Sequence, residues 1–273
     1  MPDWQLTGTV APERLTPARL ELHAAVQAVA APGLALLPAR EDASHGSLSW
    51  SDRLGGFVGE PLPPTSVRAG LALATLTLCV LDGAERRVGE LALPGVALAQ
   101  AAGWLSQQLK SLLNTEMEVN APDLPDFLLA QRPAGTPFRM HRESAEMARY
   151  YANANRLLGQ WATRTILVRT WPHHFDIAVL VPGPGESQSV GVGLSPGDSS
   201  YAEPYWYVTP WPYPDARSLP RLAGGGAWHT NGWVGAVLTG SQATRASADA
   251  QRRQVGEFLE SAIAALRSVL GRS

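Results

Sequence analysis

The chain has 273 residues and a formal net charge of -2, a length that suits one large domain or two small ones with a substantial core. Its single cysteine, Cys79, excludes a disulfide framework within the chain. The first residues lack the basic and apolar stretch of a secretion signal, so we expect a cytoplasmic protein. The near-neutral charge argues against nucleic-acid or anionic-membrane binding, and the longest apolar run, 71–81, is too short for a membrane span.

Four segments show the three- and four-residue spacing of apolar side chains that is typical of amphipathic helices. These segments cover 16–32, 96–113, 147–161 and 255–270. Thr16 followed by Pro17 is expected to cap the first helix, and Pro32-Gly33 is expected to end it. The last segment is the most regular of the four.

Short strand-like segments lie between the first and second helices, and again between the third and fourth. In the first block we expect strands at 34–37, 46–50, 57–62, 67–81 and 87–93. In the second block we expect them at 165–171, 175–181, 189–194, 205–209, 226–229 and 233–238. Asn231-Gly232, between aromatic strand formers, is the strongest hairpin signal in the chain.

The order of these elements predicts the fold class. Strands come in blocks and do not alternate with helices, which indicates α+β with helices packed on antiparallel sheets. Each half reads as helix, antiparallel strands, helix, so we expect a pseudo-duplication without residue identity between the halves. The expected parts are an N-terminal α+β half over 1–117, an extended linker over 118–139 and a C-terminal α+β half over 140–273, which could together form one compact domain.

The segment at 168–178 reads Val-Arg-Thr-Trp-Pro-His-His-Phe-Asp-Ile-Ala. It resembles a bacterial domain-of-unknown-function family whose members carry Ser-Pro-Val-His-Phe-Phe-Trp-Gly-Ser-Phe-Asp-Leu-Ala at a similar place. The resemblance extends to an opening helix with a histidine, short strands with an Asp-Gly turn and a final apolar helix. The chain lacks the family's Gly-Arg after this segment. Because the family has no established activity, the resemblance implies an architecture but no mechanism.

Aromatic side chains are concentrated between Trp171 and Trp233, a range that holds five of the nine tryptophans and three of the six histidines. Such rings, interleaved with proline and glycine, often line a ligand site. We therefore expect the C-terminal half to bind a small molecule or a peptide in an aromatic-lined cleft. Strand alternation places Tyr205 and Tyr207 on one face and Trp206 on the other. The expected ligand contacts are Tyr205, Trp206, Tyr207, Trp211, Trp228 and Trp233.

An alternative is a metal-assisted or acid/base hydrolase. If 173–176 is a strand, His174 and Asp176 share one face, and His229 joins them if its strand lies alongside. An imidazole oriented by a carboxylate is common in catalytic and metal sites. The catalytic candidates are His174, Asp176 and His229, and Glu203 is added to these three as a candidate metal ligand.

A third alternative is a structural homo-oligomer, in which the aromatic rings are buried against a second copy of the chain. The sequence contains no motif that identifies a cofactor. Gly224-Gly225-Gly226 lacks the following Lys-Ser/Thr of a phosphate loop and does not open an amphipathic helix. His23 lies beside an apolar stripe of the first helix, where we expect it to be packed and not to bind a ligand.

Overall fold

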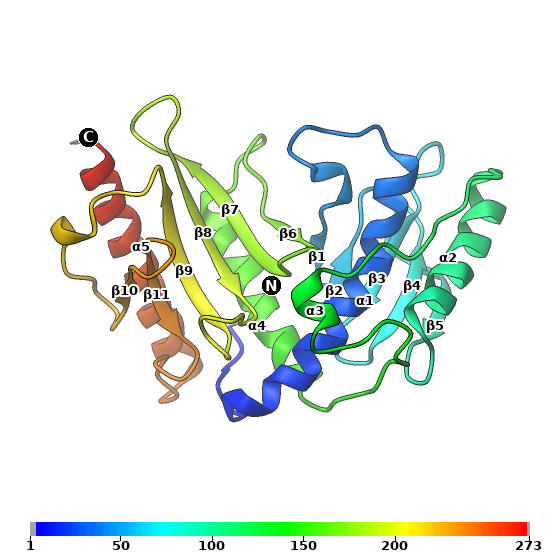
Figure 1. Ribbon diagram of the computed structural model, residues 1–273, viewed down its shortest axis with the longest axis horizontal. Coiled ribbons are helices and arrows are strands. Elements are labelled where there is room, and N and C mark those ends of the chain that lie inside the picture. Colours follow the sequence, from blue (N-terminus) through cyan, green and yellow to red (C-terminus); the bar gives the residue numbers. More distant parts are fainter. Residues whose placement is uncertain (1–3, 272–273) are drawn as a thin grey trace. The chain divides into compact units, whose positions relative to one another are not determined.

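The computed structural model describes residues 4–271 and contains two antiparallel sheets, of five and six strands, with helices packed on them (Figure 1). The predicted α+β class is confirmed. The chain divides into two compact units. The N-terminal unit consists of Pro17–Ala148 and Arg169–Phe175. The C-terminal unit consists of the residues up to Thr16, of Arg149–Val168 and of the residues from Asp176 onward.

The N-terminal unit is built around a five-stranded antiparallel meander, in which each strand pairs with the next one along the chain. Its strands are β1 (Ser49–Ser51), β2 (Gly56–Val58), β3 (Arg68–Ala72), β4 (Thr77–Leu81) and β5 (Arg87–Ala92). Its helices are α1 (Leu15–Leu36), which starts in the other unit, α2 (Leu98–Leu113), α3 (Asp126–Leu129) and the first turn of α4 (Ser144–Leu158).

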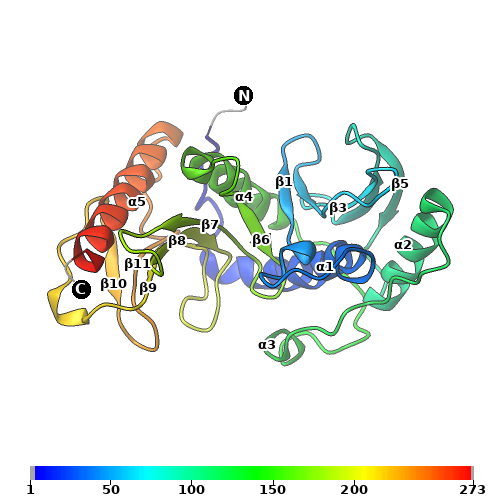
Figure 2. The ribbon, with the colours of Figure 1, turned by 90° about the horizontal axis from the view of Figure 1, so that it is seen from above.

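Burial of α1 provides much of the core of the N-terminal unit. The side chains of Leu22, Val26 and Val29 are at most 1% exposed, as expected for a helix that is apolar on most of its surface. Figures 1 and 2 place α1 along one face of the five-stranded sheet. The short strand β6 (Arg169–Trp171) is held in this unit, because the backbone groups of Thr170 and Leu48 form two reciprocal hydrogen bonds.

The C-terminal unit contains five strands of the six-stranded sheet in the order β10-β11-β9-β8-β7, while β6 is grouped with the N-terminal unit. These strands are β7 (Asp176–Pro182), β8 (Ser189–Ser195), β9 (Tyr205–Trp211), β10 (Ala227–His229) and β11 (Gly235–Thr239). Helix α5 (Ala248–Leu270) packs against β8, β9 and β11. The alternating residues Ile177, Val179 and Val181 of β7 are buried, as is typical of a strand with one covered face.

The predicted duplication is not shown by the structure. The N-terminal sheet follows the chain order, whereas in the C-terminal sheet β11 pairs with β9 and leaves β10 at the edge. The hairpin predicted at Asn231-Gly232 is confirmed, because it joins the antiparallel strands β10 and β11. Residues 230–234 connect the two strands, and Gly232 among them has a φ of 83°, a conformation that glycine adopts more readily than other residues.

The last three predicted helices are confirmed, but the first one begins before its expected cap, since Thr16 lies inside α1, and it continues past its expected end. Pro32 lies inside α1, and the strand predicted at 34–37 begins instead as the last helical turn. A Cβ atom on Gly33 would lie 2.2 Å from the carbonyl oxygen of His45, so this glycine permits close packing and does not stop the helix. Within residues 4–271, no helix has both the length and the apolar character needed to cross a membrane.

The single strand predicted over 67–81 is also wrong, because the chain turns back in its middle. The segment 73–76 is a turn that separates β3 from β4, and Leu76 has a φ of 48°. Leu73 and Leu76 are both fully buried. The two residues between them, Ala74 and Thr75, are exposed. The turn contains no glycine, proline, asparagine or aspartate, and leucines lie at both of its ends, so turn chemistry did not reveal it.

Candidate functional site

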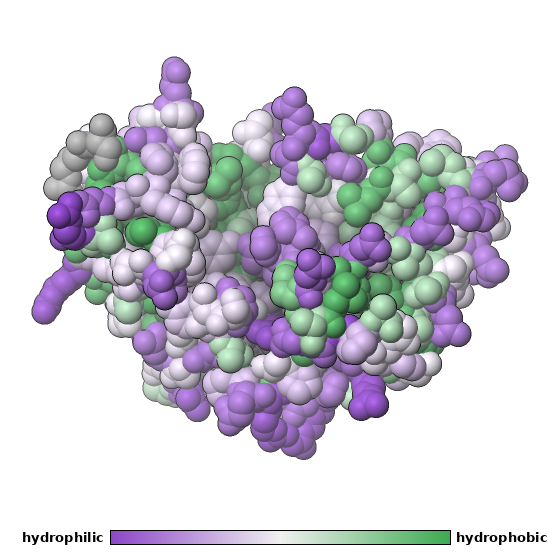
Figure 3. Space-filling model, in the orientation of Figure 1, coloured by the Kyte–Doolittle hydropathy of each residue, from purple (hydrophilic) through white to green (hydrophobic). Residues whose placement is uncertain are grey.

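The two faces of the C-terminal sheet differ, because α4 and α5 both lie on the same one (Figure 2). We call the other face the open face; it is turned toward the viewer in Figure 1. Cross-strand partners share a face, so Leu180, Gly191 and Thr209 form one row across it, and Ser189 and Trp211 belong to the next row. Figure 3 shows the surface over these strands mostly in pale colours of intermediate hydropathy.

Two aromatic side chains lie directly against glycines of the open face. A Cβ atom on Gly193 would lie 2.7 Å from the hydroxyl oxygen of Tyr207, its partner on the neighbouring strand. A Cβ atom on Gly235 would likewise lie 2.3 Å from the ring of Trp233. Both glycines therefore leave room for a ring against the backbone, as in aromatic rescue of strand glycines.

Three tyrosine rings follow one another along the open face. The ring centroids of Tyr201 and Tyr205 are 4.9 Å apart, and those of Tyr205 and Tyr207 are 6.2 Å apart. The hydroxyls of Tyr205 and Tyr207 donate to the carboxylates of Asp198 and Asp176, respectively. Burial raises the pKa of both hydroxyls, so they stay protonated and act as donors. Sequence reasoning missed Tyr201 and Asp198.

His229 has partners at both ring nitrogens. Its Nε2 atom lies 2.6 Å from the carbonyl oxygen of Asn231, which can only accept, so Nε2 carries the proton. Nδ1 then accepts from the hydroxyl of Tyr201 at 3.0 Å. The ring also stacks on Trp233, with centroids 4.3 Å apart. Both nitrogens are engaged in this arrangement, and metal binding or proton transfer would require one of these bonds to break.

The other candidate catalytic and metal-binding residues have separate partners. Glu203 accepts hydrogen bonds from the backbone N–H and the hydroxyl of Ser241, at 2.6 and 2.7 Å. Asp176 accepts from Tyr207. His174 is exposed in the N-terminal unit, within the turn 172–175, so the strand alternation predicted for His174 and Asp176 is wrong. Across residues 4–271, no group of three His, Cys, Asp or Glu side chains could hold a metal ion.

The aromatic residues expected to contact a ligand differ in exposure. Trp206 is 2% exposed and stacks on Trp4 in the core, with centroids 5.9 Å apart. Tyr205 is also buried, on the opposite face from Trp206 as the alternation predicts. Trp228 is partly buried, and its Nε1 donates to the carbonyl oxygen of Pro220. Trp211, in contrast, is 62% exposed.

Sequence reasoning missed an exposed side chain on the same face as Trp211. Leu180 on β7 is as exposed as Trp211, at 62%. Its apolar neighbours in the sequence predict a buried strand, and only the uncovered face explains its exposure. Tyr213, which follows β9, is 49% exposed and packs edge-on against Trp211 with a centroid distance of 6.0 Å. Trp211, Tyr213 and Leu180 are therefore the accessible large side chains of this region.

His23 is packed in the core of the N-terminal unit, as expected from the sequence. Its Nε2 lies 2.9 Å from the carbonyl oxygen of Pro172, and its ring lies 5.3 Å from that of Phe175 and 5.5 Å from that of Phe127. Removal from water disfavours the charged imidazole and lowers its pKa to about 4. The folded protein therefore holds this histidine in its neutral form near pH 7.

This burial predicts a loss of stability in mild acid. Between about pH 6.5 and about pH 4 the unfolded chain takes up a proton on His23 that the folded protein does not, so the free energy of unfolding falls by up to about 3 kcal/mol. Above pH 6.5 His23 contributes no pH dependence. Urea unfolding of the wild type and of His23→Gln across this range measures the effect. The variant should lack this part of the slope, and identical slopes would contradict the assignment.

Comparison of the chain with protein-family models, with curated proteins and with solved structures finds no match. The resemblance to the bacterial family therefore stays a prediction. The site has to be interpreted from its own geometry.

Proposed function

We propose that this protein is a binding module that receives a small molecule or a peptide segment on the open face of the C-terminal sheet. The observation that carries the proposal is the joint exposure of Trp211 and Leu180, each 62% exposed, on the sheet face opposite α4 and α5. Gly191 and Ser189 lie on the strand between them and present little side-chain bulk. A flat or extended ligand could lie on this surface, with Trp211 as its main contact.

The chemistry of the open face favours an uncharged ligand. Strands β7 to β11 contain no lysine, arginine or glutamate, and Asp176 is their only carboxylate. The hydroxyl of Tyr207 already donates to Asp176. Exposed aromatic rings bind by stacking and by burial of apolar area. The ligand classes that suit this surface are sugar rings, uncharged aromatic compounds and proline-rich peptides.

Replacing Trp211 with alanine is expected to weaken ligand binding about tenfold, since a stacked ring contributes on the order of 1 kcal/mol beyond the area it buries. Soluble oligosaccharides, aromatic compounds and a proline-rich peptide are first screened by tryptophan fluorescence. Isothermal titration calorimetry then measures the affinity of each hit for the wild type and for Trp211→Ala. Calorimetry is needed because the variant lacks the reporting ring.

Trp104→Ala is the matched control, because Trp104 lies on α2 of the N-terminal unit and is also partly exposed. It should leave the affinity unchanged. Leu180→Ser should weaken binding in the same direction as Trp211→Ala, since Leu180 lies two strands away on the same face. A ligand that binds both variants as tightly as the wild type would place the binding site elsewhere.

A further inference from the structure

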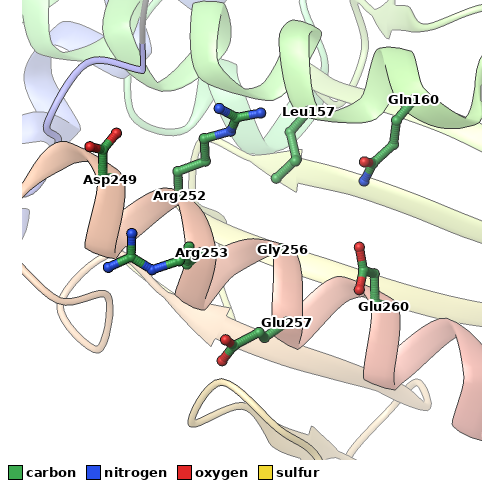
Figure 4. A pocket seen from close by; sticks show the side chains of 8 residues that line it. All are labelled: Leu157, Gln160, Asp249, Arg252, Arg253, Gly256, Glu257 and Glu260. Carbon is green, nitrogen blue, oxygen red and sulfur yellow. The ribbon is translucent and has the colours of Figure 1, made fainter.

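We propose that α5 is a self-association surface, on which a second copy of this chain docks antiparallel with Gly256 at the crossing point. This inference is independent of the proposed ligand site, because α5 lies on the opposite face of the sheet from the open face. A groove of about 360 Å³ runs between α4 and α5. It is lined by Leu157 of α4, Gln160 of the following turn η3 (Gly159–Trp161), and Asp249, Arg252, Arg253, Gly256, Glu257 and Glu260 of α5 (Figure 4).

Two oppositely charged residues of α5 lie at equal distances on either side of Gly256. Arg252 precedes it by four residues and Glu260 follows it by four, so the two lie on either side of Gly256 in Figure 4. The same spacing of four residues along the helix leads to Ala248 on one side and to Ala264 on the other, so these residues lie in one row. A two-fold axis through Gly256 would pair each small residue with a small one and each Arg252 with Glu260 of the second copy. This row is thus complementary to itself, as an isologous interface requires.

The spacing along the helix keeps the two ion pairs apart. Eight residues separate Arg252 from Glu260, which corresponds to a rise of about 12 Å. The antiparallel arrangement therefore forms two separate pairs, one on each side of the crossing. A parallel arrangement in register would instead place Arg252 beside Arg252 and Glu260 beside Glu260. The charges of Arg252 and Glu260 therefore favour the antiparallel arrangement over the parallel one.

Gly256 leaves the centre of this surface open. A Cβ atom at this position would meet no atom within 4 Å, so packing within the chain does not require glycine here. Gly256 is also costly in the middle of a 23-residue helix, since glycine is among the poorest helix formers. Helices packed through ridges and grooves approach most closely where the residue at the contact is small. A glycine at the crossing point therefore suits a partner helix.

The charged groups of this surface are available for a partner. Arg252 and Glu260 are exposed, and within residues 4–271 neither side chain forms an ion pair or hydrogen bond. Arg267, farther along α5, shows the contrast, because its guanidinium donates to the carbonyl oxygen of Pro182. Substitutions at Arg252 and Glu260 should therefore leave the fold intact, which makes the proposal directly testable.

Sedimentation velocity over a concentration series tests the proposal. The wild type should form dimers more readily at low than at high ionic strength, because exposed charges are screened by salt. Arg252→Glu and Glu260→Arg should each weaken self-association about tenfold, since each turns two attractive pairs into repulsive ones. Gly256→Leu should prevent close approach of the helices. Circular dichroism establishes that each variant is folded.

Charge exchange distinguishes this surface from any other. An equimolar mixture of Arg252→Glu and Glu260→Arg should associate as well as the wild type, because every facing pair in the heterodimer is again of opposite charge. The double variant R252E/E260R should regain dimerisation for the same reason. The control Arg139→Glu makes the same charge change at an exposed position of the N-terminal unit and should have no effect.

Three results would overturn the proposal. The first is a wild-type protein that stays monomeric at all concentrations. Any partner of α5 would then be a different protein. The second is a dimer that Arg252→Glu and Glu260→Arg do not weaken. The third is a mixture of these two variants that fails to associate.

Discussion

Replacing Gln251 with leucine is expected to lower the free energy of unfolding by about 3 to 6 kcal/mol, as measured by urea denaturation. Gln251 is 1% exposed. Its Oε1 accepts from the indole N–H of Trp4 at 3.1 Å and from the backbone N–H and hydroxyl of Thr7 at 3.0 and 2.9 Å. Its Nε2 donates to the carbonyl oxygens of Thr7 and Thr244. Leucine satisfies none of these groups, and several stay buried without partners.

The control for this loss is Gln107→Leu on the exposed side of α2, which should change stability by less than about 0.5 kcal/mol. Gln251 joins the residues before Thr16 to the final helix within the C-terminal unit. Faster proteolysis at the N-terminal segment should therefore accompany the Gln251→Leu substitution. A loss below 1 kcal/mol would show that water replaces the amide in this network.

Replacing Arg132 with methionine is expected to lower the free energy of unfolding by about 3 to 5 kcal/mol, because it leaves a buried carboxylate without its partner. The Nε atom of Arg132 lies 3.1 Å from Glu21 Oε2, and the two side chains are only 4% and 10% exposed. Its Nη2 also donates to the carbonyl oxygen of Thr136 at 2.7 Å. The guanidinium lies 4.5 Å from the ring centroid of Phe138. Urea unfolding measures the loss.

Two comparisons show whether the unpaired charge causes this effect. The double variant E21M/R132M should recover most of the lost stability, since both charged groups are then gone. Arg87→Met breaks an exposed pair with Glu90, whose side chains are 45% and 62% exposed, and should cost less than about 1 kcal/mol. If the double variant is no more stable than Arg132→Met, lost packing and not charge explains the effect.

The candidate site shows how far sequence reasoning reached. The density of aromatic residues pointed to the C-terminal sheet, and strand alternation correctly separated Tyr205 from Trp206. Neither pattern shows which of these rings are accessible to solvent. Trp206 is covered by Trp4, which is about two hundred residues away in the sequence, whereas Trp211 has no such cover. The surroundings of His229 depended in the same way on Tyr201, which local alternation does not bring near it.

The sequence by itself determined three of the four predicted helices, most strands, the Asn231-Gly232 hairpin and the α+β class, because hydrophobic period and turn chemistry act over a few neighbouring residues. Tertiary structure decided that α1 continues through Pro32, that the chain turns at 73–76, and that β11 pairs with β9. It also decided which side chains are exposed on the open face. The physical reason is that periodicity reports which side of an element is apolar, but not which distant segment covers that side.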